Sequence, residues 1–323
     1  MYLHFHQRAG PNILSFDWEK EGIHMISVKG LEKEFNGFRA LRGLDMHVKS
    51  GEIYGFIGQN GAGKSTTMSI LAGLSRQKSG CCIVNGQEVS SIRHPSDLHI
   101  GYLPEEPKFY PWMTARETLE YLSGGRDTGQ ISKILEWTGL AQSAERRVGG
   151  FSRGMKQRLG IGATLVRDPE LFILDEPSSA LDPEGRSEVL HLIEDLKNMG
   201  KTVLFSTHIL DDVERVCDTI GMISAGRMVF EKSLAQLQSE NEQPIFDITT
   251  SAPIDSKSLD TLKLLAGVIS VTEDPVSYSV RVKHKSIAQQ LTHFFADREI
   301  VVEFFALRKT RLEDLFLKEV NAK

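Results

Sequence analysis

The pattern of apolar and polar residues predicts alternating buried strands and amphipathic helices between residues 25 and 238. Leu44, Met46 and Val48 alternate with polar residues, as in a half-buried strand. Buried strands are predicted at 53–57, 171–174 and 202–205, and a hairpin at 220–223 and 228–231. Helical spacing is found at 65–74, 114–122 and 131–141. We therefore expect an α/β domain over 25–238, with a parallel core sheet, an antiparallel β edge and a helical insertion at about 88–157.

A polar break at 239–244 separates this region from a second, smaller pattern, so residues 239–323 are expected to form an α+β accessory domain. Strands are predicted at 245–249, 268–273, 278–282 and 300–305, and helices at 259–265 and 287–295. This β-α-β-β-α-β order suggests a ferredoxin-like sandwich. A last helix is predicted from Thr310, with a capping box to Glu313. Its apolar stripe fits either core packing or contact with a partner.

Residues 1–24 differ from the rest of the chain because they show no clean hydrophobic period. They also lack the basic start, apolar centre and small-residue cleavage site of a signal peptide. Residues 20–22, Lys-Glu-Gly, can be encoded by a purine-rich sequence of the kind that binds ribosomes, shortly before Met25. Two interpretations stay open, a disordered extension and translation that begins at Met25.

Composition limits the function classes. With 38 basic and 43 acidic side chains, the net charge is −5, which argues against a nucleic-acid-coating protein. No apolar run approaches the ~20 residues of a membrane helix, so a membrane role would have to come through a partner. Three cysteines are too few for a disulfide framework, and reduced thiols in the cytosol are expected.

The most specific motif is residues 58–65, Gly-Gln-Asn-Gly-Ala-Gly-Lys-Ser, which fits the phosphate loop G-x-x-x-x-G-K-[ST]. It lies between a predicted strand and a predicted helix, as the motif requires. The backbone N–H groups of such a loop surround phosphate oxygens, the lysine reaches the outer phosphates, and the serine hydroxyl binds Mg²⁺. The expected nucleotide-binding residues are Gly58, Gln59, Asn60, Gly61, Ala62, Gly63, Lys64, Ser65 and Thr66.

Three polar residues follow two of the buried strands. Asp175 and Glu176 come directly after 171–174, and His208 follows 202–205. The carboxyl ends of parallel strands face the ligand crevice of an α/β sheet. Asp175 is therefore placed to hold Mg²⁺, Glu176 to activate a water molecule, and His208 to contact a γ-phosphate. Simple polarity at strand ends is the alternative.

Two further features fit a nucleotide site less specifically. Ser152 is a good N-cap for a helix that follows Gly149 and Gly150, so a second helix N-terminus is available for an anion. An ordinary capped helix explains the same pattern. Phe35 lies about 23 residues before the phosphate loop and could stack on adenine, although a core position is the alternative.

Taken together and in this order, these residues resemble the ATP-binding subunit of an ABC transporter. The resemblance covers roughly residues 25–237 and implies the P-loop NTPase fold of the ABC ATPase type. The motif Phe-Ser-Arg-Gly-Met-Lys-Gln-Arg at 151–158 is similar to the signature of drug, antibiotic and ion exporters with a separate membrane subunit. Three departures are Glu105 where the Q-loop usually has Gln, Ala180 for a D-loop Gly, and Arg153 for a signature Gly.

The resemblance implies ATP as substrate, Mg²⁺ as cofactor and a transport-coupled ATPase. In the family, Ser152, Gly154 and Gln157 belong to a signature that covers the γ-phosphate bound by a second chain, so a homodimer or a pair with a homologue is expected. Glu105 is placed to contact Mg²⁺ and the reaction site. A multi-spanning membrane subunit is expected as partner, at the cytoplasmic face of a bacterial cell membrane. The alternatives are a soluble ABC-type ATPase acting on ribosomes or DNA, and a nucleotide-gated module with feeble hydrolysis.

Overall fold

The computed structural model describes residues 24–125, 128–240 and 244–308. The N-terminal extension up to residue 23 and the helix expected from Thr310 lie outside the described residues. The first described strand begins at His24, one residue before the expected domain start. Within the described ranges, no helix has the length and apolar character needed to cross a membrane.

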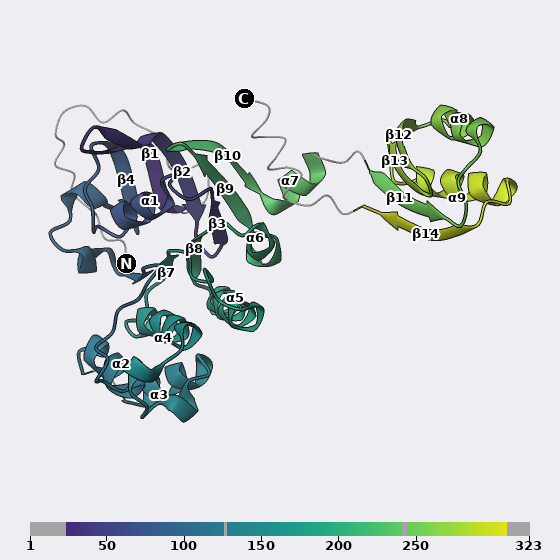
Figure 1. Cartoon of the computed structure of the whole chain (residues 1–323). Coiled ribbons are helices and arrows are strands. Elements are labelled where there is room, and N and C mark those ends of the chain that lie inside the picture. Colours follow the sequence, from purple (N-terminus) through teal and green to yellow (C-terminus); the bar gives the residue numbers. More distant parts are fainter. Residues whose placement is uncertain (1–23, 126–127, 241–243, 309–323) are drawn as a thin grey trace, which may run out of the picture.

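A six-stranded sheet forms the centre of the N-terminal region, residues 24–240 (Figure 1). Its strands, in spatial order, are β10 (Arg227–Ser233), β9 (Thr219–Ser224), β3 (Ile53–Ile57), β8 (Thr202–Thr207), β7 (Leu171–Leu174) and β6 (Ile100–Leu103). All neighbours are parallel except β10 and β9. Every residue of β3, β7 and β8 is buried, which explains their apolar runs. Their carboxyl ends meet at one edge of the sheet.

Strand β6 was not predicted by the hydrophobic pattern. It lies inside the segment expected to be helical, and with only four residues it gives too short a period to recognise. It pairs in parallel with β7, and the backbone N–H of Asp175 donates to the carbonyl of Leu103, 2.8 Å away. The strand therefore brings the segment that contains Glu105 to the edge of the sheet where β7 ends.

Three helices form the insertion, with a hydrophobic cluster of their own. They are α2 (Ala115–Ser123), α3 (Thr128–Trp137) and α4 (Arg153–Leu165), and short 3-10 turns occur at Val89–Ser91, Pro95–Leu98, Ala141–Ser143 and Val148–Gly150. A capping box starts α2, because Glu117 N donates to Thr114 Oγ1 and Thr114 N donates to Glu117 Oε2. Helix α3 ends four residues before the predicted end at 141, just ahead of Gly139, which has φ of +66°.

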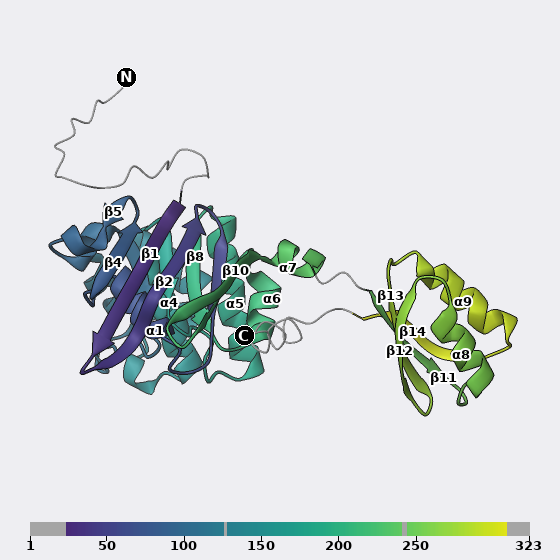
Figure 2. The same cartoon turned by 90° about the horizontal axis from the view of Figure 1, so that it is seen from above.

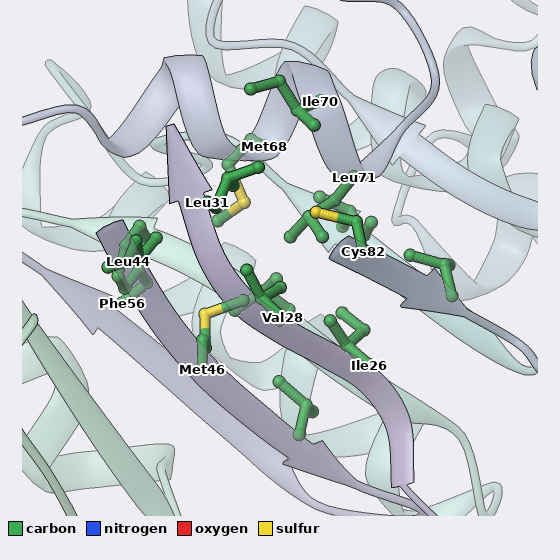
Figure 3. Close-up of a cluster of buried hydrophobic side chains, with 14 of the residues drawn as sticks. Ile26, Val28, Leu31, Leu44, Met46, Phe56, Met68, Ile70, Leu71 and Cys82 are labelled. Atoms are coloured by element: carbon green, nitrogen blue, oxygen red, sulfur yellow. The ribbon is translucent and has the colours of Figure 1, made fainter. Parts of the chain in front are cut away.

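A second sheet is antiparallel and covers the helix that follows the phosphate loop. Its order is β2 (Phe38–Lys49), β1 (His24–Phe35), β4 (Ser79–Val84) and β5 (Gln87–Glu88). Figure 3 shows Met68 and Leu71 of α1 (Lys64–Leu71) packed towards side chains of this sheet, such as Leu31 and Cys82. This core fixes α1, and with it the phosphate loop, against the central sheet.

The remaining helices of the N-terminal region are α5 (Pro183–Asn198), α6 (Leu210–Val216) and α7 (Leu234–Glu240). Val189, Ile193 and Val213 join the apolar cluster that contains the residues of β3, β7 and β8. Asp182 caps α5 by accepting from the N–H of Gly185, 3.1 Å away. Helix α5 therefore begins directly after the short segment that follows Glu176.

Residues 244–308 form a separate group of elements, which we call the C-terminal unit (Figure 2). They are β11 (Ile245–Thr250), α8 (Ser256–Leu264), β12 (Val268–Asp274), β13 (Ser277–Val282), α9 (Ile287–Asp297) and β14 (Val302–Leu307). The sheet order is β12-β13-β11-β14, and all pairs are antiparallel. This is the predicted β-α-β-β-α-β order, and its buried residues form one cluster without members from the N-terminal region.

Candidate functional site: a phosphate-binding pocket at the edge of the central sheet

The phosphate loop connects β3 to α1, and its backbone requires glycine. Gly61 and Gly63 have φ of +80° and +115°, where residues with a side chain are strained. At Gly63, an added Cβ would also lie 2.8 Å from Leu41 and 3.1 Å from the carbonyl oxygen of Ala40. The close approach of β2 therefore excludes any larger residue at this position. The backbone conformation of the loop therefore depends on glycine at these two positions.

Lys64, the first residue of α1, is 5% exposed. Its ammonium donates to the carbonyl oxygen of Gly58 at 2.7 Å, which holds the side chain along the loop. The same nitrogen lies 3.1 Å from Glu176 Oε1. Glu176 Oε1 is buried and has no hydrogen-bond partner of good geometry in the described structure, so this contact is chiefly an ion pair. A buried cation therefore lies between the loop and the carboxylate.

Asp175 is 4% exposed at the end of β7. Its Oδ1 accepts from Ser206 Oγ at 2.7 Å and from Ser65 Oγ at 3.2 Å. Burial raises the pKa of Asp175, while the hydrogen bonds from Ser206 and Ser65 oppose that rise. Two oxygen groups from α1 and β7 thus meet at one point, and such hard oxygen donors suit a magnesium ion. The sequence did not single out Ser206.

Glu176 directly follows Asp175, is 6% exposed, and has a φ of +47°. Non-glycine residues in this left-handed region are uncommon, and they cluster at functional sites. The N–H of Glu176 donates to Ser206 Oγ at 2.9 Å, which helps to hold the turn. Glu176 Oε2 lies 2.9 Å from His208 Nδ1, so two strand-end residues predicted to share an edge are in contact. One carboxylate therefore contacts both a lysine and a histidine.

Aromatic side chains also line the pocket. Phe35 and Phe38 face each other in the β1–β2 register across the turn at Asn36 and Gly37. Phe35 is 47% and Phe38 63% exposed, so neither is a core residue. The ammonium of Lys33 lies 4.7 Å from the centre of the Phe35 ring. Phe35 was expected as an aromatic surface here, whereas Phe38 was missed.

One pocket of about 400 Å³ brings most of these groups together. Its lining residues are Phe35, Phe38, Ala40, Asn60, Gly61, Gly63, Lys64, Ser65, Thr66, Glu105, Glu176, Ser179 and His208. Glu105 is exposed and reaches this pocket by way of strand β6. Of the predicted residues, Gly58, Gln59, Ala62 and Asp175 lie in the loop or beneath it without lining the pocket. An open cavity with lysine, two carboxylates, a histidine and aromatic walls can bind a phosphorylated aromatic ligand.

The structure does not bring the predicted signature residues into this pocket. Ser152 caps α4 by accepting from the N–H of Met155 at 3.2 Å, as its sequence context predicts. Gln157 is 4% exposed, and its buried Nε2 has no hydrogen-bond partner in the described structure. Neither these residues nor Gly154 line the pocket. Within the described part of one chain, the signature and the phosphate loop therefore form two separate surfaces.

The fold and the pocket define a P-loop nucleotide-binding protein, and comparison with known proteins narrows the class. The profile of the ABC transporter family matches residues 41–179. The chain is similar to the linearmycin resistance ATP-binding protein LnrL of Bacillus subtilis, with 31% identity over 91% of this chain and 97% of that protein. It is also similar to the bacitracin transport ATP-binding protein BcrA of Bacillus licheniformis, with 34% identity over 92% and 97% of the two chains.

A solved structure supports the same conclusion. The structure of cbiO1 from Clostridium perfringens, described as part of the ABC transporter complex cbiONQ, is similar with a TM-score of 0.61. It shares 27% sequence identity and matches 68% of this chain and 92% of that chain. The chain therefore belongs to the ATP-binding proteins of ABC transporters, and it is an ATPase. The resemblance and the ABC ATPase fold predicted from the motifs are confirmed.

Proposed function

We propose that this chain powers export by hydrolysing ATP, with Glu176 as the residue that activates water. The observation that carries this proposal is the position of Glu176 between Lys64 at 3.1 Å and His208 at 2.9 Å, on the wall of the pocket. Hydrolysis of a phosphoanhydride needs a carboxylate that can accept a proton from water. It also needs a cation that binds the phosphate, and here Lys64 and a histidine lie beside the carboxylate.

ATP is held by three sets of residues in this account. The exposed rings of Phe35 and Phe38 stack on adenine, the N–H groups of residues 58–66 surround the phosphates, and Lys64 neutralises their charge. Ser65 and Asp175 would hold Mg²⁺, and Glu105 lies near enough to the same pocket to assist. When bound, the ion supplies positive charge that stabilises the phosphate oxygens.

Lys64 and Glu176 change partners as ATP binds. In this structure the two side chains neutralise each other. Phosphate oxygens, with their higher charge, attract the Lys64 ammonium and leave the carboxylate of Glu176 free to accept a proton from water. His208, which is half-exposed and contacts Glu176, then holds the γ-phosphate and the attacking water. The carboxylate of Glu176 therefore acts as a base only after nucleotide has bound.

A second ATPase chain completes the site in this proposal. Ser152, Gly154 and Gln157 lie away from the pocket of their own chain. Ser152, at the start of α4, is exposed and can contact another molecule, whereas Gln157 is buried in the same helix. These residues cover the nucleotide held by the other chain, so ATP binding closes a dimer and hydrolysis opens it. The dimer is either two copies of this chain or this chain with a homologue.

A membrane subunit is the proposed transport partner, and the helical insertion carries a surface that suits it. Tyr110, Trp112 and Tyr121 form a ring cluster, with centroids 5.0 and 6.0 Å apart, and all three are exposed by 49–65%. A cleft of about 330 Å³ lined by Pro107, Phe109 and Leu122 lies in the same region. Aromatic clusters of this kind are typical of interface anchors.

Export of a drug or antibiotic is the transport direction favoured by the relatives whose printed names mention linearmycin resistance and bacitracin transport. The chain then acts at the cytoplasmic face of the cell membrane through its membrane partner. We propose residues 25–238 as the ATPase domain and 239–323 as a C-terminal accessory domain. The single apolar cluster of the C-terminal unit supports this division. The role of the accessory domain in this proposal is regulation or dimerisation.

The proposal is tested by purification of the Glu176→Gln variant from native membranes in mild detergent, with ATP and Mg²⁺ added. Recovery of a multi-spanning membrane protein in stoichiometric amount is the expected result. The Lys64→Met variant, which lacks the cation for phosphate, serves as the matched control for ATP dependence. Trp112→Ala should lose the membrane partner while ATP hydrolysis continues. Recovery of ribosomes or DNA in place of a membrane protein would contradict the transport role.

A further inference from the structure

The most deeply buried carboxylate near the site is Asp212, and neither the phosphate loop nor the pocket includes it. Asp212 is 0% exposed in α6, although it lies only four residues after His208. A buried carboxylate without partners is strongly destabilising, so its partners indicate what it holds in place.

Both partners of Asp212 belong to the segment that follows Glu176. Ser178 Oγ donates to Asp212 Oδ2 at 2.6 Å, and Ser178 is itself 1% exposed. Arg186 Nε donates to Asp212 Oδ1, and this pair forms an ion pair. Ser178 is the second residue after Glu176, and Arg186 lies in the first turns of α5. Asp212 therefore fastens both ends of the loop formed by residues 178–182.

This arrangement links two parts of the site that are distant in sequence. Ser179, the neighbour of Ser178, lines the pocket, and the N–H of Ser179 donates to the carbonyl oxygen of Glu176 at 3.1 Å. On the other side, the short helix with Asp212 continues the segment that carries His208. The contact between Glu176 and His208 thus lies between two segments that the Asp212 carboxylate connects, in addition to the pairing of β7 with β8 and the hydrogen bond between Glu176 and Ser206.

We propose that Asp212 is a positioning residue for ATP hydrolysis, acting through Ser178 and Arg186 to hold Glu176 and His208 in contact. The inference rests on the proposed role of Glu176. Asp212 does not touch the nucleotide pocket, so its loss should affect the hydrolysis step more than the binding of ATP. A displacement of about 1 Å at a reacting group can lower a rate by roughly 100-fold.

The test compares kcat and KM for ATP with the affinity for a fluorescent ATP analogue in full-length variants. Asp212→Asn, which removes the ion pair with Arg186, should lower kcat about 10- to 30-fold, with KM and affinity within about twofold of wild type. The double variant Asp212→Asn with Arg186→Gln should be no slower than Asp212→Asn alone, because both changes break the same unit. Ser178→Ala is the milder variant and should lower kcat about threefold.

Asp195→Asn is the matched control. Asp195 lies on α5, like Arg186, and accepts from Trp137 Nε1 at 3.0 Å, but it does not line the pocket. This variant should keep kcat while it loses a similar amount of thermal stability. The proposal is overturned if Asp212→Asn and Ser178→Ala both keep the wild-type kcat, or if kcat falls equally in Asp195→Asn. Failure of the proposed function would be seen separately, as hydrolysis that survives Glu176→Gln.

Discussion

The N-terminal region and the C-terminal unit differ in how deeply their charged side chains are buried. In the N-terminal region, Lys64, Asp175, Glu176 and Asp212 are all at least 94% buried, and Lys64 and Glu176 also line the pocket. Among the described residues 244–308, the only buried polar residue is Thr250. The ion pair of Asp247 and Arg308 lies at the surface, with both side chains at least one third exposed.

We interpret this difference in the burial of charged side chains as a difference between residues that serve a reaction and residues that stabilise the fold. Burial of several charges lowers stability unless they are paired and hydrogen-bonded, so it is expected where a reaction needs them. The C-terminal unit has an apolar core of helix and sheet residues and surface charges of little energetic weight. We therefore expect changes in the N-terminal region to alter hydrolysis and changes in the C-terminal unit to alter stability or assembly.

The largest effect is expected from Lys64→Met, which keeps much of the side-chain volume and removes the charge. Hydrolysis should fall about 100- to 1,000-fold, and ATP should bind more weakly, because no other buried cation faces the described pocket. Steady-state ATPase rates and nucleotide titration measure this. Lys201→Met is the matched control, since Lys201 is also buried and paired with two carboxylates, but lies outside the pocket. Equal losses in both variants would contradict the account.

A cavity in the C-terminal unit should leave the ATPase intact. Leu291 is 0% exposed in α9, and Leu291→Ala should destabilise the C-terminal unit by about 2–5 kcal/mol. Hydrogen exchange should show lost protection over 244–308, while ATP hydrolysis stays within about twofold of wild type. The parallel variant Leu204→Ala, in buried strand β8, should lower hydrolysis as well as stability. Hydrolysis that falls in Leu291→Ala would show that the two regions are coupled.

The surface ion pair of the C-terminal unit predicts a small, pH-dependent effect. Hydrogen bonds from Arg308, and secondarily from Ser279, lower the pKa of Asp247 below its ordinary 3.8, against the opposing effect of burial. The stabilisation is therefore present above pH 3.8 and is lost as the pH falls through the lower pKa of the folded state. Arg308→Ala should cost about 0.5 kcal/mol at pH 7, because the pair is screened by solvent. The melting temperatures of wild type and variant should converge as the pH falls below the lowered pKa of Asp247.

A similarly small effect, of opposite sign, is expected at Ala180, in the segment after Glu176. Ala180 has φ of +52° and is exposed, so the departure from the family's glycine leaves an alanine in the left-handed region. Ala180→Gly removes this strain, which costs about 1–2 kcal/mol. The glycine also loses more backbone entropy on folding, which lowers stability by about 0.5–1 kcal/mol. A net gain of about 0.5 kcal/mol in the free energy of unfolding is expected. Chemical denaturation measures it, and a loss of stability would show that Ala180 is not strained.

Local patterns in the sequence predicted the parts of the site that are contiguous in the chain. The phosphate loop is a single run of residues, and Asp175 and Glu176 directly follow a buried strand, so both could be placed without a structure. Ser206 and Asp212 could not, because their partners Asp175 and Ser178 lie 31 and 34 residues away. Phe38 was missed because only the register of β1 with β2 brings it beside Phe35.

The same reasoning holds for the fold. The C-terminal unit was predicted because each of its strands and helices carries its own period, and the order of elements then restricts the sheet. Strand β6 was missed because four residues within a helix-rich segment give too short a pattern, and only pairing with β7 stabilises it. The hydrophobic pattern along the chain therefore predicts a helix or strand only when the element is long enough for its period to repeat.

The most direct test of the central claim is ATP hydrolysis by Glu176→Gln, measured together with ATP binding in the same preparation. The account predicts that hydrolysis falls at least about 100-fold, because the base is lost. It also predicts that ATP binds as tightly as in wild type or more tightly, because the neutral amide no longer competes with phosphate for Lys64. Hydrolysis within about threefold of the wild-type rate would show that Glu176 is not the residue that activates water.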